Sequence, residues 1–344
     1  GDVESWDVMP GKQVEKDALL LDDASLYAGA AGIALLYLKY YVATEQEKYL
    51  RKAEAGIRYV IRKYRGKEDF ATEVPFLQGA YIGYLNGPAG GAYVAKELYK
   101  ITGEERYKQF ALTVADDAIE AAKDEQGALT WYGFYGILGE GGLILFLLDV
   151  YNTFGGDKYL DAAAKAAKYI ADHKEDAPQG GYRWYVMDTE TFPTDIAKKA
   201  AQYIQNIADY SEDGEAALVK YNDTYLTDLY YLGVCQGPIG TSRLFYKLYR
   251  ITGDESYKDF VIKLTNGLLA AGAPTKHSDG YWRTNCYCCG AAGMLEHFLH
   301  VHKLTGNSVY LDAAYEAAEA IIGESTYQHK VRNWYTSWNR HEPD

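Results

Sequence analysis

Cysteines are the residues of this sequence whose type and spacing most directly indicate chemistry. Cys286, Cys288 and Cys289 fall within four residues, and the fourth cysteine is Cys235. Such clustering is unsuited to a framework of disulfides and is typical of a metal site or a reactive thiol centre. Zinc binds thiolates at about 2.3 Å, and catalytic sites usually have three protein ligands and an open position. The cysteines therefore predict such a site if the fold brings Cys235 to the others.

The elements that must position these cysteines can be read from an internal repeat. Five segments share the pattern Gly-x-x-Gly, followed by a helical stretch and a tyrosine. The second glycine lies at residues 32, 90, 142, 240 and 293, and the tyrosine follows 17 residues later each time. In four segments another glycine stands 13 residues after the second one, whereas the first segment has Glu45 there. This agreement predicts a repeat architecture.

Each repeat is predicted to be a pair of helices. Leu244, Leu248 and Tyr249 form an apolar stripe at helical spacing, and Gly253 then ends the helix. A second amphipathic helix begins near the repeated tyrosine, as the alanine-rich residues 159–170 illustrate. The sequence therefore predicts helical hairpins of about 50 residues each.

The spacing of the hairpins predicts how they assemble. The first glycines lie at 29, 87, 139, 237 and 290, and the gap of 98 residues is twice 49, so it is expected to hide a further hairpin. Six or seven such hairpins are expected to close into an all-α fold, an α/α toroid, with the glycines where the inner helices start. No linker separates two parts, so residues 1–344 are predicted to form one domain, with recognisable repeats from about 25 to 325.

The repeat register places two cysteines at equivalent points. Cys235 and Cys288 each stand two residues before the first glycine of their repeats, and Cys289 follows directly. Neighbouring helices pack about 8–10 Å apart, so these side chains can converge on one point. Helix N-termini also favour thiolate over thiol. We therefore expect one Zn²⁺ at Cys235, Cys288 and Cys289.

Two alternatives to the metal site are buried packing cysteines and a Cys235–Cys288 disulfide. Packing alone does not call for cysteine, because the other repeats have different residues at this position. These are Tyr27, Leu85 and Ile137. Cys286, two residues before Cys288, is either an alternate ligand or a bystander.

The segments Gly233-Val-Cys235-Gln-Gly237 and Cys288-Cys289-Gly290, together with the Gly-x-x-Gly helix starts, resemble the lanthionine synthetase C-like family. Residues 25–34 also resemble the first repeat of that family. The resemblance implies an α/α toroid with Zn²⁺ at one end, bound by Cys, Cys and His, with a Cys-Cys-Gly variant in which Cys289 replaces the His. Family cyclases add a Cys thiol to a dehydroamino acid in a peptide, so a peptide or a small thiol is the implied partner.

The chain departs from the family at the residues that handle protons. Where the resemblance implies a His, an Asp, a Tyr and an Arg, this sequence has Leu138, Gly83, Gln236 and Tyr231, respectively. The metal ligands are thus retained while the acid/base residues are not. We expect thiol binding with weak or absent lanthionine formation.

Glu140, Asn86 and Arg283 are the candidate catalytic residues, because they could line the same mouth as the cysteines. Glu140 is an unusual charge at a helix start, and the alternative reading is that it complements the helix dipole. His297 lies eight residues beyond Cys289, about 12 Å along a helix. This is too far for a shared metal, so His297 is expected to be a hydrogen-bonded core residue, and His302 a structural substitute for the tyrosines at its repeat position.

Composition excludes some partners. The net charge of -13 disfavours a nucleic-acid backbone and an anionic membrane surface as partners. The sequence has no apolar run long enough to span a bilayer, which takes about 20 residues. The start at Gly1-Asp2 without Met favours a trimmed N-terminus and export, whereas the family's cyclases favour the cytoplasm.

Two other functions compete with the zinc-dependent thiol enzyme. A glycan-active α/α barrel, either a hydrolase or an epimerase, would suit the 34 Tyr and six Trp residues, and needs a pair of carboxylates. Glu140 and Asp228 are the only candidates for such a pair. A binding protein in which zinc only joins two helices is the third possibility.

Overall fold

The computed structural model describes residues 23–70, 83–131, 135–177, 180–184, 232–235, 237–275, 285–288, 290–323, 325–328 and 331–333. They belong to two compact units, Gly1–Ile170 and Ala171–Asp344. The hairpin expected in the long gap between repeats falls mainly on residues 185–231, outside the described residues.

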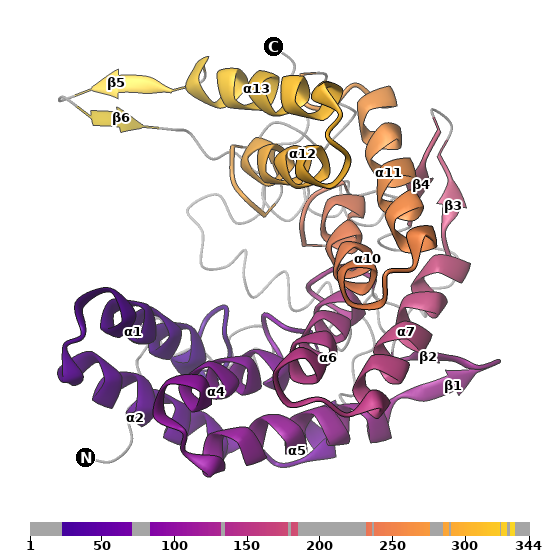
Figure 1. Cartoon of the computed structure of the whole chain (residues 1–344). Helices are drawn as coiled ribbons and strands as arrows, with labels where there is room; N and C mark the ends of the chain where they lie inside the picture. The colour runs from indigo at the N-terminus through magenta and orange to yellow at the C-terminus, as the bar shows by residue number, and fades with distance from the viewer. Residues whose placement is uncertain are drawn as a thin grey trace, which may run out of the picture. The chain divides into compact units, whose positions relative to one another are not determined.

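Helical hairpins build the first unit (Figure 1). They pair α1 (Ala30–Thr44) with α2 (Glu47–Lys63), and α4 (Pro88–Thr102) with α5 (Glu105–Ala121). They are followed by α6 (Glu140–Phe154) and α7 (Asp157–Asp172). The smaller elements are the 3₁₀ helix η1 (Lys67–Phe70) and an antiparallel ribbon, which β1 (Lys123–Glu125) forms with β2 (Ala128–Thr130). Helix α4 contacts both α1 and α6, so the first helices of successive repeats lie side by side.

The second unit repeats this plan. It pairs α10 (Pro238–Thr252) with α11 (Glu255–Ala270), and α12 (Ala291–Thr305) with α13 (Ser308–Gly323). Two antiparallel ribbons accompany them, β3 (Glu175–Asp176) with β4 (Tyr182–Arg183), and β5 (Thr326–Gln328) with β6 (Val331–Asn333). Helices α10 and α12 are in contact. The ten α-helices of the described residues confirm the prediction of a mainly helical chain built from hairpins.

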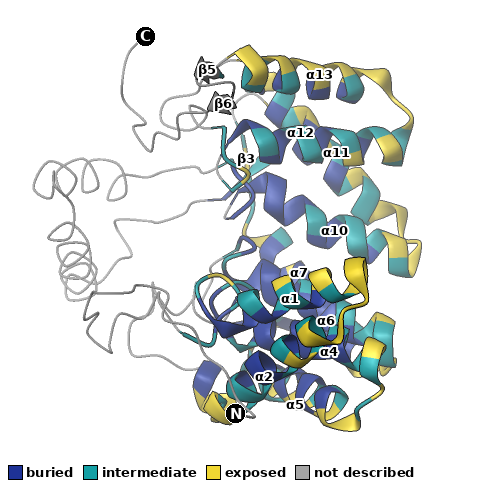
Figure 2. Cartoon of the chain, turned by 90° about the vertical axis from the view of Figure 1, so that its left-hand side faces the viewer, coloured by how far each residue is buried: buried dark blue, intermediate teal, exposed yellow. Residues whose placement is uncertain are grey.

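The first helices of the hairpins carry most of the core. Figure 2 shows long buried stretches on α4, α6 and α10, whereas exposed residues follow the outer side of α13. Helix α6 buries most of its residues, including Leu143, Phe146 and Val150. The buried Lys96 of α4 pairs with the neighbouring Glu97 at 2.9 Å and approaches Asp149 of α6 at 3.8 Å. Both apolar burial and an ion pair therefore join successive first helices.

The glycines of the repeat stand where the sequence predicted. The N-caps of α1, α4, α6, α10 and α12 are Gly29, Gly87, Gly139, Gly237 and Gly290. The end of each first helix also follows the prediction: Gly103 caps α4 with a φ of 69°, and Glu45 adopts a φ of 55° at the equivalent position after α1. Residues with positive φ end a helix at low cost when they are glycine.

The second glycine of each Gly-x-x-Gly has a steric role. The turn that precedes each first helix, here called its lead-in turn, folds back over the first helical turn. A β-carbon on Gly293 would lie 2.3 Å from the carbonyl oxygen of Tyr287, and one on Gly90 would lie 2.2 Å from that of Tyr84. Real β-carbons do not approach a backbone oxygen so closely, so only glycine permits this contact.

The same glycines also contact the neighbouring repeat. A β-carbon on Gly90 would lie 2.6 Å from the β-carbon of Leu26, and one on Gly293 would lie 2.6 Å from a methyl group of Val234. Leu26 and Val234 belong to the lead-in turns of the preceding hairpins. Gly90 and Gly293 therefore each hold their own lead-in turn and receive a side chain from the turn before it.

The repeated tyrosine joins each hairpin to the preceding one. In three repeats the structure shows its hydroxyl donating to a polar side chain on the second helix of that preceding hairpin. Tyr107 bonds Glu54 at 3.2 Å, Tyr159 bonds Asp116 at 2.9 Å, and Tyr310 bonds Asn266 at 2.8 Å. These tyrosines are thus used in packing between helices, with the ring buried and the hydroxyl hydrogen-bonded.

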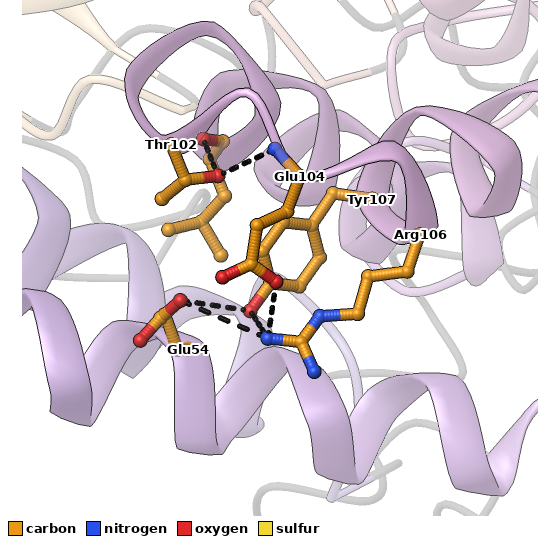
Figure 3. A network of polar contacts seen from close by, with 6 residues as sticks. Glu54, Thr102, Glu104, Arg106 and Tyr107 are labelled. Carbon is orange, nitrogen blue, oxygen red and sulfur yellow. Dashed lines mark hydrogen bonds and ion pairs between the residues drawn. The ribbon is translucent and has the colours of Figure 1, made fainter.

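Figure 3 shows the first of these contacts within a wider polar network. Arg106 lies beside Tyr107, donates to its hydroxyl at 3.1 Å, and pairs with Glu104 at 2.5 Å. Thr102 bonds the carbonyl oxygen of Leu98 at 2.9 Å and accepts from the amide of Glu104 at 3.2 Å. The threonine thereby satisfies a carbonyl at the end of α4 and an amide at the start of α5, which explains the tight Thr-Gly connection.

Replacing Gly293 with alanine should destabilise the protein strongly, because the new methyl group would meet both the Tyr287 carbonyl and Val234. We expect a loss of about 3 kcal/mol in the free energy of unfolding, measured by urea denaturation. Gly323→Ala is the control, because a β-carbon there would meet nothing within 4 Å. It should leave stability unchanged or raise it by up to about 1 kcal/mol. Equal effects of the two substitutions would contradict the steric role.

Candidate functional site

Two of the predicted zinc ligands lie on lead-in turns that are directly bonded to each other. The amide of Val234 donates to the carbonyl oxygen of Cys288 at 2.8 Å, and the Sγ of Cys235 lies 3.7 Å from the same oxygen. The turn of Cys288 is itself closed by the amide of Gly290, which donates to the carbonyl oxygen of Cys286 at 3.0 Å. The second unit therefore brings Cys235 and Cys288 together, as the repeat register predicted.

The described cysteines are reduced, and they differ in exposure. Cys235 is buried, whereas Cys286 and Cys288 are partly accessible. Cys289 lies outside the described residues, so the structure does not test the third ligand. Within the residues that are described, no group of three His, Cys, Asp or Glu side chains could hold a metal ion.

The chemistry of this place suits a thiophilic cation. Cys235 and Cys288 each lie three residues before the first residue of a helix, α10 and α12, respectively. The partial positive charge of a helix N-terminus lowers the pKa of a nearby thiol and favours the thiolate that metals bind. Two thiols from neighbouring turns would supply two of the three or four protein ligands that a zinc site needs.

A charged cluster lies beside these cysteines. The guanidinium of Arg243 on α10 donates to the hydroxyl of Tyr287 at 2.6 Å and forms an ion pair with Glu296 on α12. The Tyr287 hydroxyl also bonds Glu296, and the guanidinium lies 5.2 Å from the centre of the tyrosine ring. Burial, followed by the bond to Glu296, raises the pKa of Tyr287, while Arg243 opposes the shift. The hydroxyl therefore stays protonated and donates to the carboxylate.

Sequence reasoning did not find this cluster. Tyr287 stands between two cysteines, but its partners lie 44 and nine residues away on two different helices. Arg243 and Glu296 do share a signal, since both stand three residues after the second glycine of their repeats. Comparing equivalent positions for opposite charges would have paired them.

The lead-in turns of the second and third repeats are packed too tightly for the acid that the family resemblance implies. A β-carbon on Gly83 would lie 1.9 Å from the carbonyl oxygen of Leu138. An aspartate at this position would therefore displace the neighbouring turn. Leu138, where the resemblance implies a His, carries no titratable group, so neither turn supplies an acid or base from these positions.

The structure describes Asn86 but not Arg283, the other two residues that the sequence proposes as catalytic. Asn86 lies just before the N-cap of α4 and is 6% exposed, and its Oδ1 has no hydrogen-bond partner among the described residues. Arg283 lies outside the described residues, so its predicted role stays a prediction. The same holds for Asp228, Tyr231 and Gln236.

Glu140 is completely buried at the first residue of α6. Its Oε1 accepts from the hydroxyl of Thr130 at 2.7 Å and from the amide of Trp131 at 2.9 Å. The Trp131 indole in turn donates to the carbonyl oxygen of Ala118 at 2.9 Å. The carboxylate thus holds the end of β2 against the N-terminus of α6, where the helix dipole also favours a negative charge.

Two tyrosines lie close to this carboxylate. The rings of Tyr135 and Tyr169 stack with their centres 6.4 Å apart. Burial is the main cause that raises the pKa of Tyr135, and the charge of Glu140 adds to it. Burial likewise raises the pKa of Tyr169. Both hydroxyls are therefore protonated at neutral pH.

His297 is a core residue with both ring nitrogens bonded, as the sequence predicted. Its Nδ1 lies 3.1 Å from the hydroxyl of Ser242, and its Nε2 lies 3.0 Å from the hydroxyl of Thr265. Burial lowers its pKa to about 3, so the imidazole is neutral in the folded protein. His302 bonds the carbonyl oxygen of Asn307 at 2.9 Å at the end of α12, in keeping with a structural role.

One comparison with known proteins identifies a family. The sequence model of a family described as lanthionine synthetase C-like protein matches residues 21–332. A search of curated proteins found no match.

Solved structures similar to this chain share its fold at low sequence identity. Nisin cyclase superposes with a TM-score of 0.59 at 16% identity, over 89% of this chain and 72% of that chain. A sugar epimerase from a ruminal bacterium gives 0.54 at 12% identity, over 93% and 78% of the two chains. The cellobiose 2-epimerase of Spirochaeta thermophila gives 0.54 at 12% identity, over 92% and 77%. These similarities confirm the α/α toroid as the fold class.

The structure also bears on the membrane prediction. Among the described helices, none has the length and apolar character that crossing a bilayer requires.

Substitution of Glu140 should separate its structural role from a chemical one. Glu140→Ala should lower the free energy of unfolding by about 3 kcal/mol, because the Thr130 hydroxyl and the Trp131 amide lose a buried acceptor. Glu140→Gln keeps one acceptor oxygen and should cost clearly less in the same urea titration. If the two substitutions were equally costly, the acceptor role assigned to Oε1 would be wrong.

His297 should make the protein less stable in mild acid. The pKa is about 3 in the folded protein and about 6.5 in the unfolded chain, so between these values only the unfolded chain binds the proton. Stability should therefore fall as the pH falls below about 6.5, by about 2 kcal/mol between pH 7 and pH 5. His297→Gln should remove this part of the pH dependence, measured by urea unfolding of the reduced protein with a chelator present. An identical dependence in both proteins would contradict the buried neutral state.

Proposed function

The chain belongs to the lanthionine synthetase C-like family, and from that premise we propose that it binds one Zn²⁺ and activates an external thiol. The proposed ligands are Cys235, Cys288 and Cys289. The observation that carries the proposal is the direct bond between the lead-in turns of Cys235 and Cys288, at 2.8 Å from the Val234 amide to the Cys288 carbonyl. Family membership and the N-termini of α10 and α12 support the same assignment.

A zinc ion bound there would supply Lewis-acid activation, which lowers the pKa of a bound thiol and leaves a nucleophilic thiolate at neutral pH. Three protein thiolates would leave one position for an external ligand. The substrate class that this favours is a cysteine-containing peptide or a small thiol. The similarity to nisin cyclase is consistent with a peptide.

Addition of a thiol to a dehydroamino acid also needs proton handling by the protein. A sulfur–carbon bond forms at the β-carbon, and a proton must be delivered to the α-carbon as the double bond is lost. General acid catalysis of such a step contributes typically about 10²–10⁴-fold. Leu138 provides no proton, and Gly83 is packed against the Leu138 carbonyl oxygen. We therefore propose thiol binding with slow or absent cyclisation.

The glycan-active alternative has less support. The epimerase structures share the fold with this chain at 12% identity, which does not extend to their activity. Glu140, one of the two carboxylates considered for a glycosidase pair, is completely buried and accepts bonds from Thr130 and Trp131. A general acid or nucleophile must reach its substrate, so this position is unsuited to that chemistry.

Metal content is the first test. Reduced wild-type protein purified with zinc present should contain about one Zn²⁺ per chain by elemental analysis, and Cys288→Ala should contain almost none. Cys286→Ala is the matched control, since it removes a thiol from the same turn that is not a proposed ligand, and it should retain the metal. Metal-free wild-type protein with an oxidised Cys235–Cys288 pair would refute the proposal.

The open position is tested with cobalt in place of zinc. Adding a small thiol should change the visible spectrum of the Co²⁺ protein, because the thiolate enters the free position, whereas a zinc site that only joins two helices would be closed and would not respond.

A dehydrated precursor peptide should be cyclised weakly or not at all. Leu138→His should not restore cyclisation, because the aspartate position at Gly83 cannot be filled. Efficient cyclisation by the unmodified protein would show that other residues deliver the proton.

A further inference from the structure

We propose that Tyr287, Arg243 and Glu296 form a clamp that fixes the cysteine-bearing turn before α12 and thereby sets its affinity for a thiophilic metal ion. The inference rests on the proposed function, since it concerns the same site. It assigns a positioning role to three residues, none of which is a proposed ligand.

The clamp connects one turn to two helices. Tyr287 is flanked by Cys286 and Cys288, and its hydroxyl reaches both Arg243 on α10 and Glu296 on α12. The ion pair between Arg243 and Glu296 closes the triangle, and the guanidinium also lies over the tyrosine ring at 5.2 Å from its centre. All three groups therefore contact one another, so the tyrosine ring has little freedom to turn.

Three consecutive anchors act on this turn. The carbonyl oxygen of Cys286 accepts from the amide of Gly290 at 3.0 Å, and the carbonyl oxygen of Cys288 accepts from the amide of Val234 at 2.8 Å. Between them the carbonyl oxygen of Tyr287 lies against Gly293. These contacts hold the backbone, while the side chain of Tyr287 is the anchor that ties the turn to α10.

The clamp should affect the geometry of the cysteine-bearing turn more than the free energy of unfolding of the protein. The side chains of Arg243 and Glu296 are 25% and 38% exposed, and ion pairs so accessible to water contribute little to folding. A metal ion responds differently, because its ligands must be held at fixed distances and angles. Residues that orient metal ligands through a second layer of contacts typically change metal affinity by roughly 10–100-fold when they are replaced.

The first unit contains a matched arrangement without cysteines. Tyr84 stands six residues before the second glycine of its repeat, as Tyr287 does, and Tyr93 stands three residues after it, as Glu296 does. The two tyrosine rings meet edge to face, with their centres 5.2 Å apart. Removing the Tyr84 hydroxyl therefore makes the same chemical change at the same repeat position, in a repeat that carries no cysteine.

The test compares Tyr287→Phe with Tyr84→Phe in the full reduced chain. Both substitutions keep the aromatic ring and remove one hydroxyl. Competition with a chromophoric chelator should give a zinc dissociation constant at least 10-fold higher for Tyr287→Phe than for wild type, and unchanged within about 2-fold for Tyr84→Phe. Arg243→Lys, which keeps the charge but loses the planar donor pair, should give an intermediate loss.

Hydrogen exchange provides a readout that does not depend on zinc. In the metal-free protein the amides of Val234 and Gly290 should exchange faster in Tyr287→Phe than in wild type, since both bond the clamped turn. If wild type binds no zinc, the proposed function fails, and the exchange rates still decide the clamp. If wild type binds zinc and Tyr287→Phe has the same affinity and exchange rates, the clamp is overturned while the proposed function stands.

Discussion

The close approach of a backbone carbonyl to the second glycine of four of the repeats is the constraint on which the other features depend. A β-carbon on Gly32, Gly90 or Gly293 would lie 2.2–2.3 Å from the carbonyl oxygen of Leu26, Tyr84 or Tyr287, respectively. Because no side chain fits there, the lead-in turn can fold back on the helix that it precedes. The residue that follows such a carbonyl is thereby held at a fixed height above the helix start, which is where Cys288 stands.

This arrangement separates the scaffold from its chemistry. The same turn position is occupied by Tyr27, Leu85 and Cys288 in three repeats. The carbonyl oxygens of Leu85 and Cys288 each accept a hydrogen bond from a backbone amide in the lead-in turn of the preceding repeat. The bonds run from Tyr27 to Leu85 and from Val234 to Cys288, both at 2.8 Å. The backbone contact between neighbouring turns therefore forms with different side chains at this position, and in the last two repeats it brings Cys235 close to Cys288.

The two units use their lead-in turns differently. In the first unit Gly83 packs against the carbonyl of Leu138, and the buried Glu140 holds Thr130 and Trp131, so the space is filled by structural contacts. In the second unit the turn of Cys288 stays partly accessible and is bordered by charged side chains. This contrast is the reason why we propose thiol binding for this chain, with slow or absent addition to a double bond.

The sequence by itself determined the hairpins, the glycine caps at both ends of the first helices, and the alignment of Cys235 with Cys288. These features recur at fixed intervals, because each repeat must solve the same local steric problem. Only the tertiary structure decided that Tyr107 reaches Glu54, that Glu140 holds Trp131, and that Tyr287 joins Arg243 and Glu296. Most of these contacts join segments that are separated by a turn or by a whole repeat. Which side chains meet across such distances depends on the angle at which elements pack, and a pattern along one chain does not encode that angle.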